Sequence, residues 1–278
     1  MGKYFNVKVK PTILASDQHN GAHSAGDLLF DWFAFDMPKG AAAIRGITTL
    51  IRGVNGAAQT ARDFTLYFAH PSKSGAAPTS LGAEHATVDG FGYYNNLIGG
   101  VTIDVNSNVG HLDYMNVMAT GGGGGGDQIP FINIEGRPNL TKDGYNTVYL
   151  AGICGTSSTW DFGTAVVTSG AVDVSELSAA QLVNADIQGT DPRTVFAPGD
   201  IIHAEDDIIL GEVESMADAN TITFKADGSA TESDTSYTVP TNLAAWKIQN
   251  GADAAGDLGS GDELYNINPI TIIIHFEK

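Results

Sequence analysis

The sequence predicts an all-β protein made of a main domain and a small β-barrel inserted late in the chain. Short segments rich in β-branched and aromatic residues recur along the chain, and Gly, Asn, Asp or Pro bounds each of them. Dipeptides such as Asn55-Gly56 and Asp143-Gly144 supply residues that tolerate positive φ in tight turns. Helical periodicity is scarce, with one candidate over residues 174–184. These observations favour antiparallel sheets over helical bundles.

The main domain is expected to cover residues 1–170 plus 258–278. Its first predicted strand, residues 4–9, alternates so that Phe5, Val7 and Val9 share one face. Further strands are expected over residues 28–35, 44–52, 64–69, 101–105, 129–134, 148–153 and 165–168.

The stretch over residues 269–276 reads PITIIIHF and is largely apolar on both faces. Such a strand is expected in the centre of a sheet, because an edge strand exposes one side to water. We expect it to return to the main domain beside the N-terminal strand, which places both chain ends on one domain.

Residues 196–257 are expected to form the inserted unit, an acidic small barrel of the SH3-like or OB-like kind followed by a linker. Short apolar segments with tight turns follow one another there, a spacing typical of such barrels. Residues 251–261 (GADAAGDLGSG) have the composition of a linker. The preceding stretch, residues 171–195, is expected to be a helical or linker connection because it contains the helical pattern.

The charge of the chain is strongly negative and uneven. The net charge is −18, and residues 171–257 hold 16 acidic against 3 basic residues, a net charge of −13. Nucleic-acid binding is not expected, because no region has the Lys and Arg density that neutralises phosphates. The acidic segment is interpreted as a solubilising surface, with a cation-dependent contact as the alternative.

Motifs for catalysis, cofactors and metals are absent from the sequence. There is no P-loop, no Gly-x-Ser-x-Gly and no zinc spacing, and the segment from Asp104 departs from the calcium-loop pattern. Cys154 is the single cysteine, so no intrachain disulfide forms, and no apolar run reaches the roughly 18 residues of a membrane span. We therefore expect a non-enzymatic protein without cofactor, metal or membrane contact.

Candidate interface residues fall into three groups. The N-terminal arm is locally basic, with Lys3, Lys8 and Lys10 in a chain that is otherwise acidic. Large aromatic residues dominate interface energetics, but the same residues are common in core strands. Six consecutive glycines are either a loop tip or a place where backbone packs closely on a neighbouring subunit. Besides the lysines, the candidates are Trp32, Phe33, Tyr93, Tyr94 and the glycine run from Gly121 to Gly126.

The segments YFNVKVKPTILAS, GDLLFDWFAFDMPKGAAAIRGITTLIRG, FTLYFA and YNINPITIIIHFE resemble uncharacterised virion structural proteins of marine tailed bacteriophages. The resemblance covers residues 1–170 plus 258–278. It implies a β-sandwich, jelly-roll-like in form, that is displayed on a capsid or tail, and it implies no active site.

The expected function is therefore that of a capsid decoration (cement) protein, which stabilises or coats a phage head through many copies of a modest contact. Its partners would be the capsid protein and further copies of itself, as a homo-oligomer such as a trimer. The protein would be made in the host cytoplasm and reside in the virion. A tail, fibre or collar component is one alternative, and a carbohydrate-binding β-sandwich module is another.

Overall fold

The chain is all-β. In the computed structural model, every regular element of the described residues is a strand, apart from the short 3-10 helix η4 (Pro192–Thr194). The structure describes residues 3–13, 22–52, 62–83, 86–88, 96–105, 108–112, 115–120, 132–155, 158–159, 166–168, 184–189, 191–204, 208–219, 221–225, 248–250 and 268–278.

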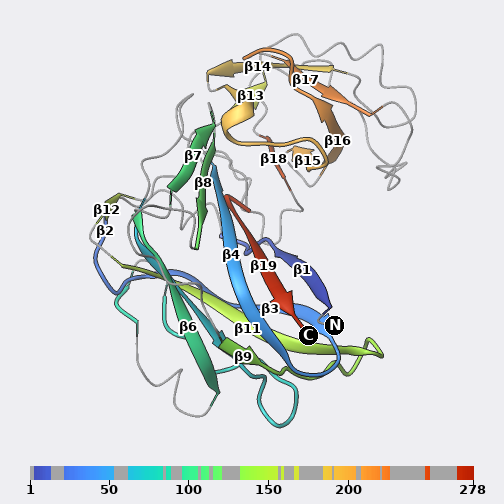
Figure 1. Ribbon diagram of the computed structural model, residues 1–278. Coiled ribbons are helices and arrows are strands. Elements are labelled where there is room, and N and C mark those ends of the chain that lie inside the picture. Colours follow the sequence, from blue (N-terminus) through green and yellow to red (C-terminus); the bar gives the residue numbers. More distant parts are fainter. Residues whose placement is uncertain are drawn as a thin grey trace.

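Sheet 1 is antiparallel and has the C-terminal strand in its interior (Figure 1). Its order is β1 (Tyr4–Val9), β19 (Ile270–Glu277), β4 (Ala42–Arg52), β8 (Met115–Ala119) and β7 (Asn108–Leu112), with β9 (Ile132–Ile134) beside the start of β4. Ile272 pairs with Val9 on one side and with Thr49 on the other. The prediction that this strand is central and lies beside the N-terminal strand is confirmed.

Sheet 2 is also antiparallel, and β11 is its central strand. It comprises β3 (Leu28–Pro38), β11 (Tyr145–Cys154), β5 (Phe64–Ala69) and β6 (Leu97–Ile103), with β10 (Arg137–Pro138) beside the start of β11. A separate two-stranded ladder joins β2 (Ala22–His23) to β12 (Ser158–Thr159).

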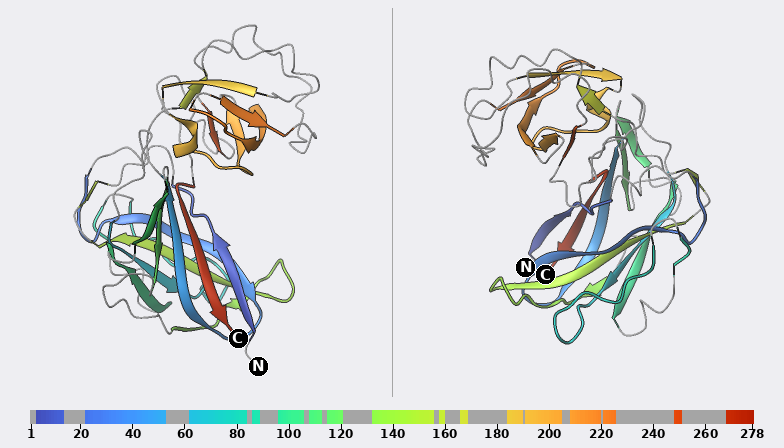
Figure 2. Two further views of the ribbon diagram at one scale, coloured as in Figure 1. Left: turned by 45° about the horizontal axis from the view of Figure 1, so that its top comes forward. Right: turned by 180° about the vertical axis from the view of Figure 1, so that it is seen from behind.

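The two sheets share one core, which gives a sandwich-like arrangement (Figure 2). Ile44, Ile47 and Ile272 of sheet 1 lie in the same buried cluster as Phe64 and Leu150 of sheet 2. The outer face of sheet 2 carries a smaller cluster of Leu28, Leu81, Ala151 and Ile153. Successive side chains of a strand point to opposite faces of its sheet, so residues that face the shared core alternate with residues that face outward.

A third antiparallel sheet forms a second unit. Its order is β13 (Val166–Thr168), β14 (Asn184–Gly189), β17 (Thr221–Phe224), β16 (Ile208–Ser215), β15 (Ile201–Ala204) and β18 (Ile248–Asn250). Phe196, Ile202, Val213 and Phe224 are buried in this unit. Among the described residues the ladders end at β13 and β18, so the expected closure into a barrel is not observed.

The start of the second unit differs from the expectation in two places. Strand β13 was expected in the main domain but pairs with β14, and β14 lies in the stretch expected to be helical or linker. Residues 184–189 (NADIQG) have little intrinsic strand preference. They are extended because pairing with β13 and β17 satisfies their backbone, so tertiary context overrides propensity. Residues 169–183 and 226–247 lie outside the described part of the chain.

Candidate functional site

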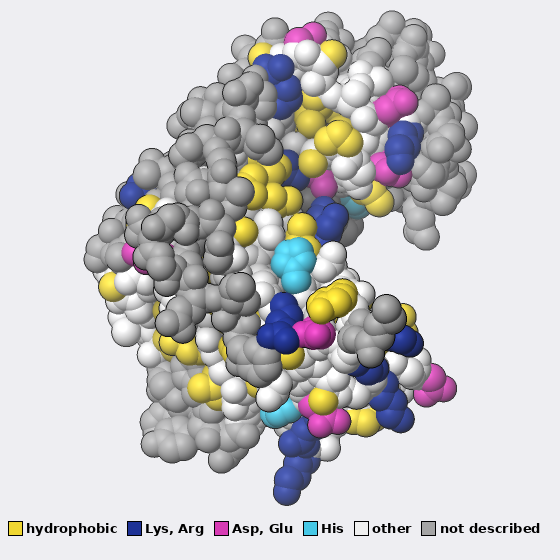
Figure 3. All heavy atoms as spheres, viewed as in Figure 1, with side chains coloured by type: hydrophobic (Ala, Val, Ile, Leu, Met, Phe, Trp, Pro, Cys, Tyr) yellow, Lys and Arg dark blue, Asp and Glu magenta, His cyan; other side chains and the backbone are white. Residues whose placement is uncertain are grey.

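Four exposed basic side chains surround the two chain ends at one end of sheet 1, and a fifth, Lys8, lies further along β1, opposite Ile273 of β19. We call this group the terminal basic surface: Lys3, Lys8, Lys39, Arg45 and Lys278. The backbones of Lys3 and Lys278 exchange two hydrogen bonds, at 3.0 and 2.8 Å, and the Lys278 ammonium donates to the carbonyl of Lys39. Dark blue Lys and Arg side chains are visible over this part of the sandwich in Figure 3.

One carboxylate is bound into the terminal basic surface. Arg45 pairs with Glu277, and the Tyr4 hydroxyl donates to Glu277 Oε1 at 3.2 Å. The hydrogen bond from Arg45 lowers the pKa of the Glu277 carboxyl below its usual value, with a smaller contribution from Tyr4. The other four basic residues carry no carboxylate partner within the described part of the chain, so the surface is positive.

The third predicted lysine has a different role. Lys10 follows β1 at the opposite end of the strand, and its Nζ lies 3.4 Å from Oδ1 of Asp200 in the second unit. Its charge is therefore directed to a carboxylate of the same chain, whereas Lys3 and Lys8 stay exposed. The three lysines were grouped because they lie within ten residues of one another in the sequence. Their closeness in sequence does not show that the end of β1 near Lys10 contacts the second unit.

A buried guanidinium joins the sandwich to the second unit. Arg52 is the last residue of β4 and is 7% exposed. Its Nη1 donates to the carbonyl of Phe196 at 2.9 Å, and its Nη2 lies 3.5 Å from Oδ2 of Asp200. Burial lowers the pKa of the Arg52 guanidinium, and the Asp200 carboxylate acts in the opposite direction. A charge so far removed from water needs this carboxylate nearby.

The turn that holds Asp200 is built by its own sequence. Gly199 has φ of +89°, and the Asp200 N–H donates to the Ala197 carbonyl at 3.0 Å, which closes a tight turn after Pro198. Oδ2 of Asp200 also accepts from the Ala197 N–H at 2.9 Å. The Gly199 N–H donates to the Val213 carbonyl, and the Val213 N–H donates to the Asp200 carbonyl, both at 2.8 Å. These two bonds fix the turn on β16, so the carboxylate is preorganised toward Arg52.

The predicted aromatic anchors Trp32 and Phe33 are half-buried on opposite faces of β3. The Trp32 indole donates to the Thr79 carbonyl at 3.0 Å and packs on the outer cluster of sheet 2, while Phe33 packs on the main core. Both therefore contribute to the fold of the sandwich. The remaining candidates, Tyr93, Tyr94, Gly121 and Gly126, lie outside the described residues.

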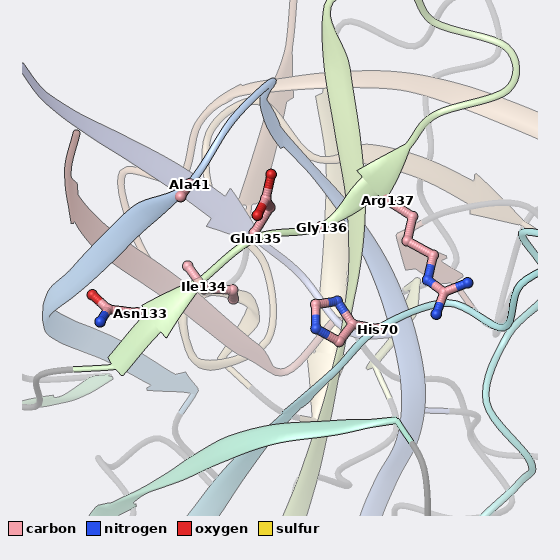
Figure 4. A pocket seen from close by; sticks show the side chains of 7 residues that line it. All are labelled: Ala41, His70, Asn133, Ile134, Glu135, Gly136 and Arg137. Atoms are coloured by element: carbon pink, nitrogen blue, oxygen red, sulfur yellow. The ribbon is translucent and has the colours of Figure 1, made fainter.

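An open pocket of about 450 Å³ lies where β5 ends and β9 passes into β10 (Figure 4). His70, Glu135 and Arg137 line it, and Asn133 and Arg137 point to opposite sides (Figure 4). Gly136 is required there, because a Cβ would lie 2.6 Å from the Thr147 carbonyl oxygen. These side chains can hydrogen-bond a small polar molecule, but they do not pair a nucleophile with a base.

The imidazole of His70 should titrate below the usual histidine range. Burial lowers its pKa from 6.5, the Arg137 charge lowers it further, and Glu135 raises it. We expect Arg137→Gln to raise the His70 pKa and Glu135→Gln to lower it, as measured by NMR titration of the imidazole protons. Equal midpoints in wild type and both variants would contradict this electrostatic description of the pocket.

The thiol of Cys154 should be inert in the folded protein. It is 2% exposed, and burial, with a smaller effect of Asp27, raises its pKa to about 12. Because the thiolate is the reactive form, we expect no modification by a thiol-specific disulfide reagent at pH 8 and full modification in denaturant. Reaction of the native protein within minutes would contradict the buried position.

The described residues contain no group of three or more His, Cys, Asp and Glu side chains placed to hold a metal ion. Within the same residues, no helix is long and apolar enough to cross a membrane. Comparisons with family models, curated proteins and solved structures give no match. The function is therefore inferred from the charges and contacts described above.

Proposed function

We propose that the chain is a non-catalytic structural protein of a phage virion, a capsid decoration protein that binds the head through its terminal basic surface. The observation that carries this proposal is the separation of charge along the molecule. Strand β4 runs for 11 residues from Ala42, near the basic surface, to Arg52 at the junction. At about 3.3 Å per residue, the two ends lie about 33 Å apart.

The described strands of the second unit lie beyond the Arg52 end of this axis. Residues 171–257 hold a net charge of −13, and the strands of the second unit belong to that segment, apart from β13. An acidic capsid face would attract the terminal basic surface and repel the second unit, so every copy would bind in the same orientation. Many modest contacts of this kind would coat and stabilise a head, because multivalency multiplies them.

The finer architecture is also proposed. The sandwich is a jelly-roll-like variant, supported by neighbours far apart in sequence, such as β19 between β1 and β4. The second unit is a small barrel inserted between β12 and β19, supported by a six-stranded ladder whose two end strands, β13 and β18, lie close to each other. The partners are the capsid protein and further copies of this chain.

Counting copies in purified particles of the phage that encodes the chain tests this function. Quantitative mass spectrometry should give a copy number close to that of the major capsid protein. Only a few copies per particle would overturn decoration in favour of a tail, fibre or collar component. Absence from the particle would overturn the virion role. Measurable glycan binding by the isolated protein would overturn it in favour of a carbohydrate-binding module.

The contact itself is tested with charge variants. The triple variant Lys3→Glu, Lys39→Glu and Lys278→Glu should lose binding to heads that lack the protein, and wild-type binding should weaken as salt is raised to about 0.5 M. Lys225→Gln is the control, because Lys225 pairs with Glu212 in the second unit, away from this surface, and the variant should bind like wild type. Equal binding by the triple variant would exclude this surface as the contact.

The inserted-unit hypothesis predicts that the sandwich folds alone. Replacing residues 166–250 by a flexible linker of about ten residues should leave a cooperative thermal transition in circular dichroism. Removing residues 196–256 should instead give a protein that aggregates, because β13 and β14 would keep an unpaired edge where β17 lay. Loss of cooperative unfolding in the first variant would contradict the hypothesis.

A further inference from the structure

Among the described strands, β1 lies at the edge of sheet 1, with one side of its backbone unpaired. The mutual hydrogen bonds of Lys3 and Lys278 fix the pattern of the ladder, in which every second residue of β1 exchanges hydrogen bonds with β19. The backbone groups of Tyr4, Asn6 and Lys8 therefore point away from β19. No described strand pairs with β1 on that side (Figure 1).

The inner face of β1 is incompletely covered. The inward residues of β19, such as Ile272 and Ile274, are fully buried, whereas Phe5 and Val7 of β1 are half-buried. Phe5 stacks on Phe276 with ring centroids 5.0 Å apart, which leaves its other side toward the free edge. An additional strand beside β1 would bury these two apolar side chains.

We propose that two copies of the chain associate through β1, paired antiparallel about a two-fold axis at Asn6, so that sheet 1 continues from one copy into the other. In this register Asn6 faces Asn6 of the second copy, and Tyr4 faces Lys8. The backbone groups of Tyr4, Asn6 and Lys8, which point away from β19, then all form hydrogen bonds with the second copy. The pairing has about six backbone hydrogen bonds, two for each facing pair. Other symmetric registers use fewer of these residues.

The side chains of β1 are self-complementary in this register. On the inner face Phe5 of one copy lies opposite Val7 of the other, an aromatic–β-branched pair that stabilises antiparallel sheets. On the outer face Lys8 lies opposite Tyr4, whose hydroxyl is bonded to the Glu277 carboxylate. No lysine faces a lysine. Lysine on an edge strand commonly prevents sheet extension, but here each Lys8 meets an aromatic ring and a carboxylate.

Backbone-directed variants test the pairing. Asn6→Pro removes the N–H at the two-fold axis but none that bonds to β19, so an edge strand tolerates it. Asn6→Ala is the matched control, because it also loses the 2.9 Å contact of Asn6 Oδ1 with His275 Nδ1 but keeps the N–H. By sedimentation equilibrium, wild type and Asn6→Ala should be dimers, and Asn6→Pro should dissociate at least about 100-fold more readily. Equal weakening by both variants would overturn the proposal.

A cross-link gives an independent readout. Facing residues in such a pair have Cα atoms about 5.5 Å apart, within the range that a disulfide spans. Asn6→Cys should therefore form a covalent dimer under mild oxidation, while the buried Cys154 does not interfere. Leu140→Cys, at a site 82% exposed in another part of the sandwich, should remain monomeric on denaturing gels. Cross-linking of both variants to the same extent would overturn the proposal, as would a monomeric wild type at about 100 µM.

This pairing goes beyond the proposed function and can fail separately from it. A dimer that does not bind phage heads supports the β1 contact and contradicts the decoration role. A monomer that binds phage heads supports the decoration role and contradicts the β1 contact. If both hold, the two terminal basic surfaces lie at opposite ends of the shared edge, because antiparallel pairing about Asn6 turns the Lys3–Lys278 end of one copy away from that of the other. One copy of each pair would then contact the head through this surface.

Discussion

Replacing Asp200 with alanine is expected to lower the free energy of unfolding by about 3–5 kcal/mol, because it leaves the buried Arg52 charge uncompensated. The Asp200 side chain is 2% exposed and the Arg52 side chain 9%, so water does not replace the lost partner. The substitution also removes the acceptor for the Ala197 N–H. Urea denaturation followed by tryptophan fluorescence measures the loss.

Two further variants separate the charge from the turn. Asp200→Asn keeps an acceptor for Ala197 but removes the negative charge, so it should lie between wild type and Asp200→Ala. Lys10→Met should change the free energy of unfolding by less than about 1 kcal/mol, because the Lys10 side chain is 41% exposed and an exposed pair contributes little. If Asp200→Ala and Lys10→Met lowered the free energy of unfolding equally, the Arg52–Asp200 pair would not be what stabilises the contact between the sandwich and the second unit.

The interior position of β19 was predictable because its evidence is local. Ile270, Ile272 and Ile274 alternate with residues that are also apolar or small, and only a strand with neighbours on both sides buries such a segment. Local patterns also identified β1, from its alternation, and β5, from its β-branched and aromatic residues, with the boundaries that the structure shows. Strand β14 was missed because its stability comes from its neighbours and not from its own residues.

The candidate site was only partly predictable, because charge partners are set by the fold. Lys3 and Lys8 were recognised from one basic window. Lys39 and Lys278 join them because the turn after β3 and the end of β19 meet at the same end of sheet 1. Arg52 and Asp200 are 148 residues apart, so nothing in the pattern around either residue indicates the other.

A second large effect is expected at Gly152, where alanine should destabilise the sandwich by about 3 kcal/mol. A Cβ on Gly152 would lie 2.3 Å from Cε1 of Phe30, far inside van der Waals contact. Phe30 is 1% exposed and packs in the core between the sheets, so its ring has little room to move. Gly152 pairs with Phe30 at an irregularity in the β3–β11 ladder, and the missing side chain admits the ring.

A compensating substitution identifies the cause of that loss. Phe30→Leu removes the ring atoms nearest to Gly152, so the double variant should be more stable than the sum of the two single effects predicts, by about 1–2 kcal/mol. Gly46→Ala is the control, because its added Cβ would lie 3.5 Å from the nearest side-chain atom, an ordinary contact. It should change the free energy of unfolding by no more than about 0.5 kcal/mol. If the effects of Gly152→Ala and Phe30→Leu were strictly additive, the Phe30 ring would not be the cause of the destabilisation. The irregular backbone of β11 would then be what excludes a side chain at position 152.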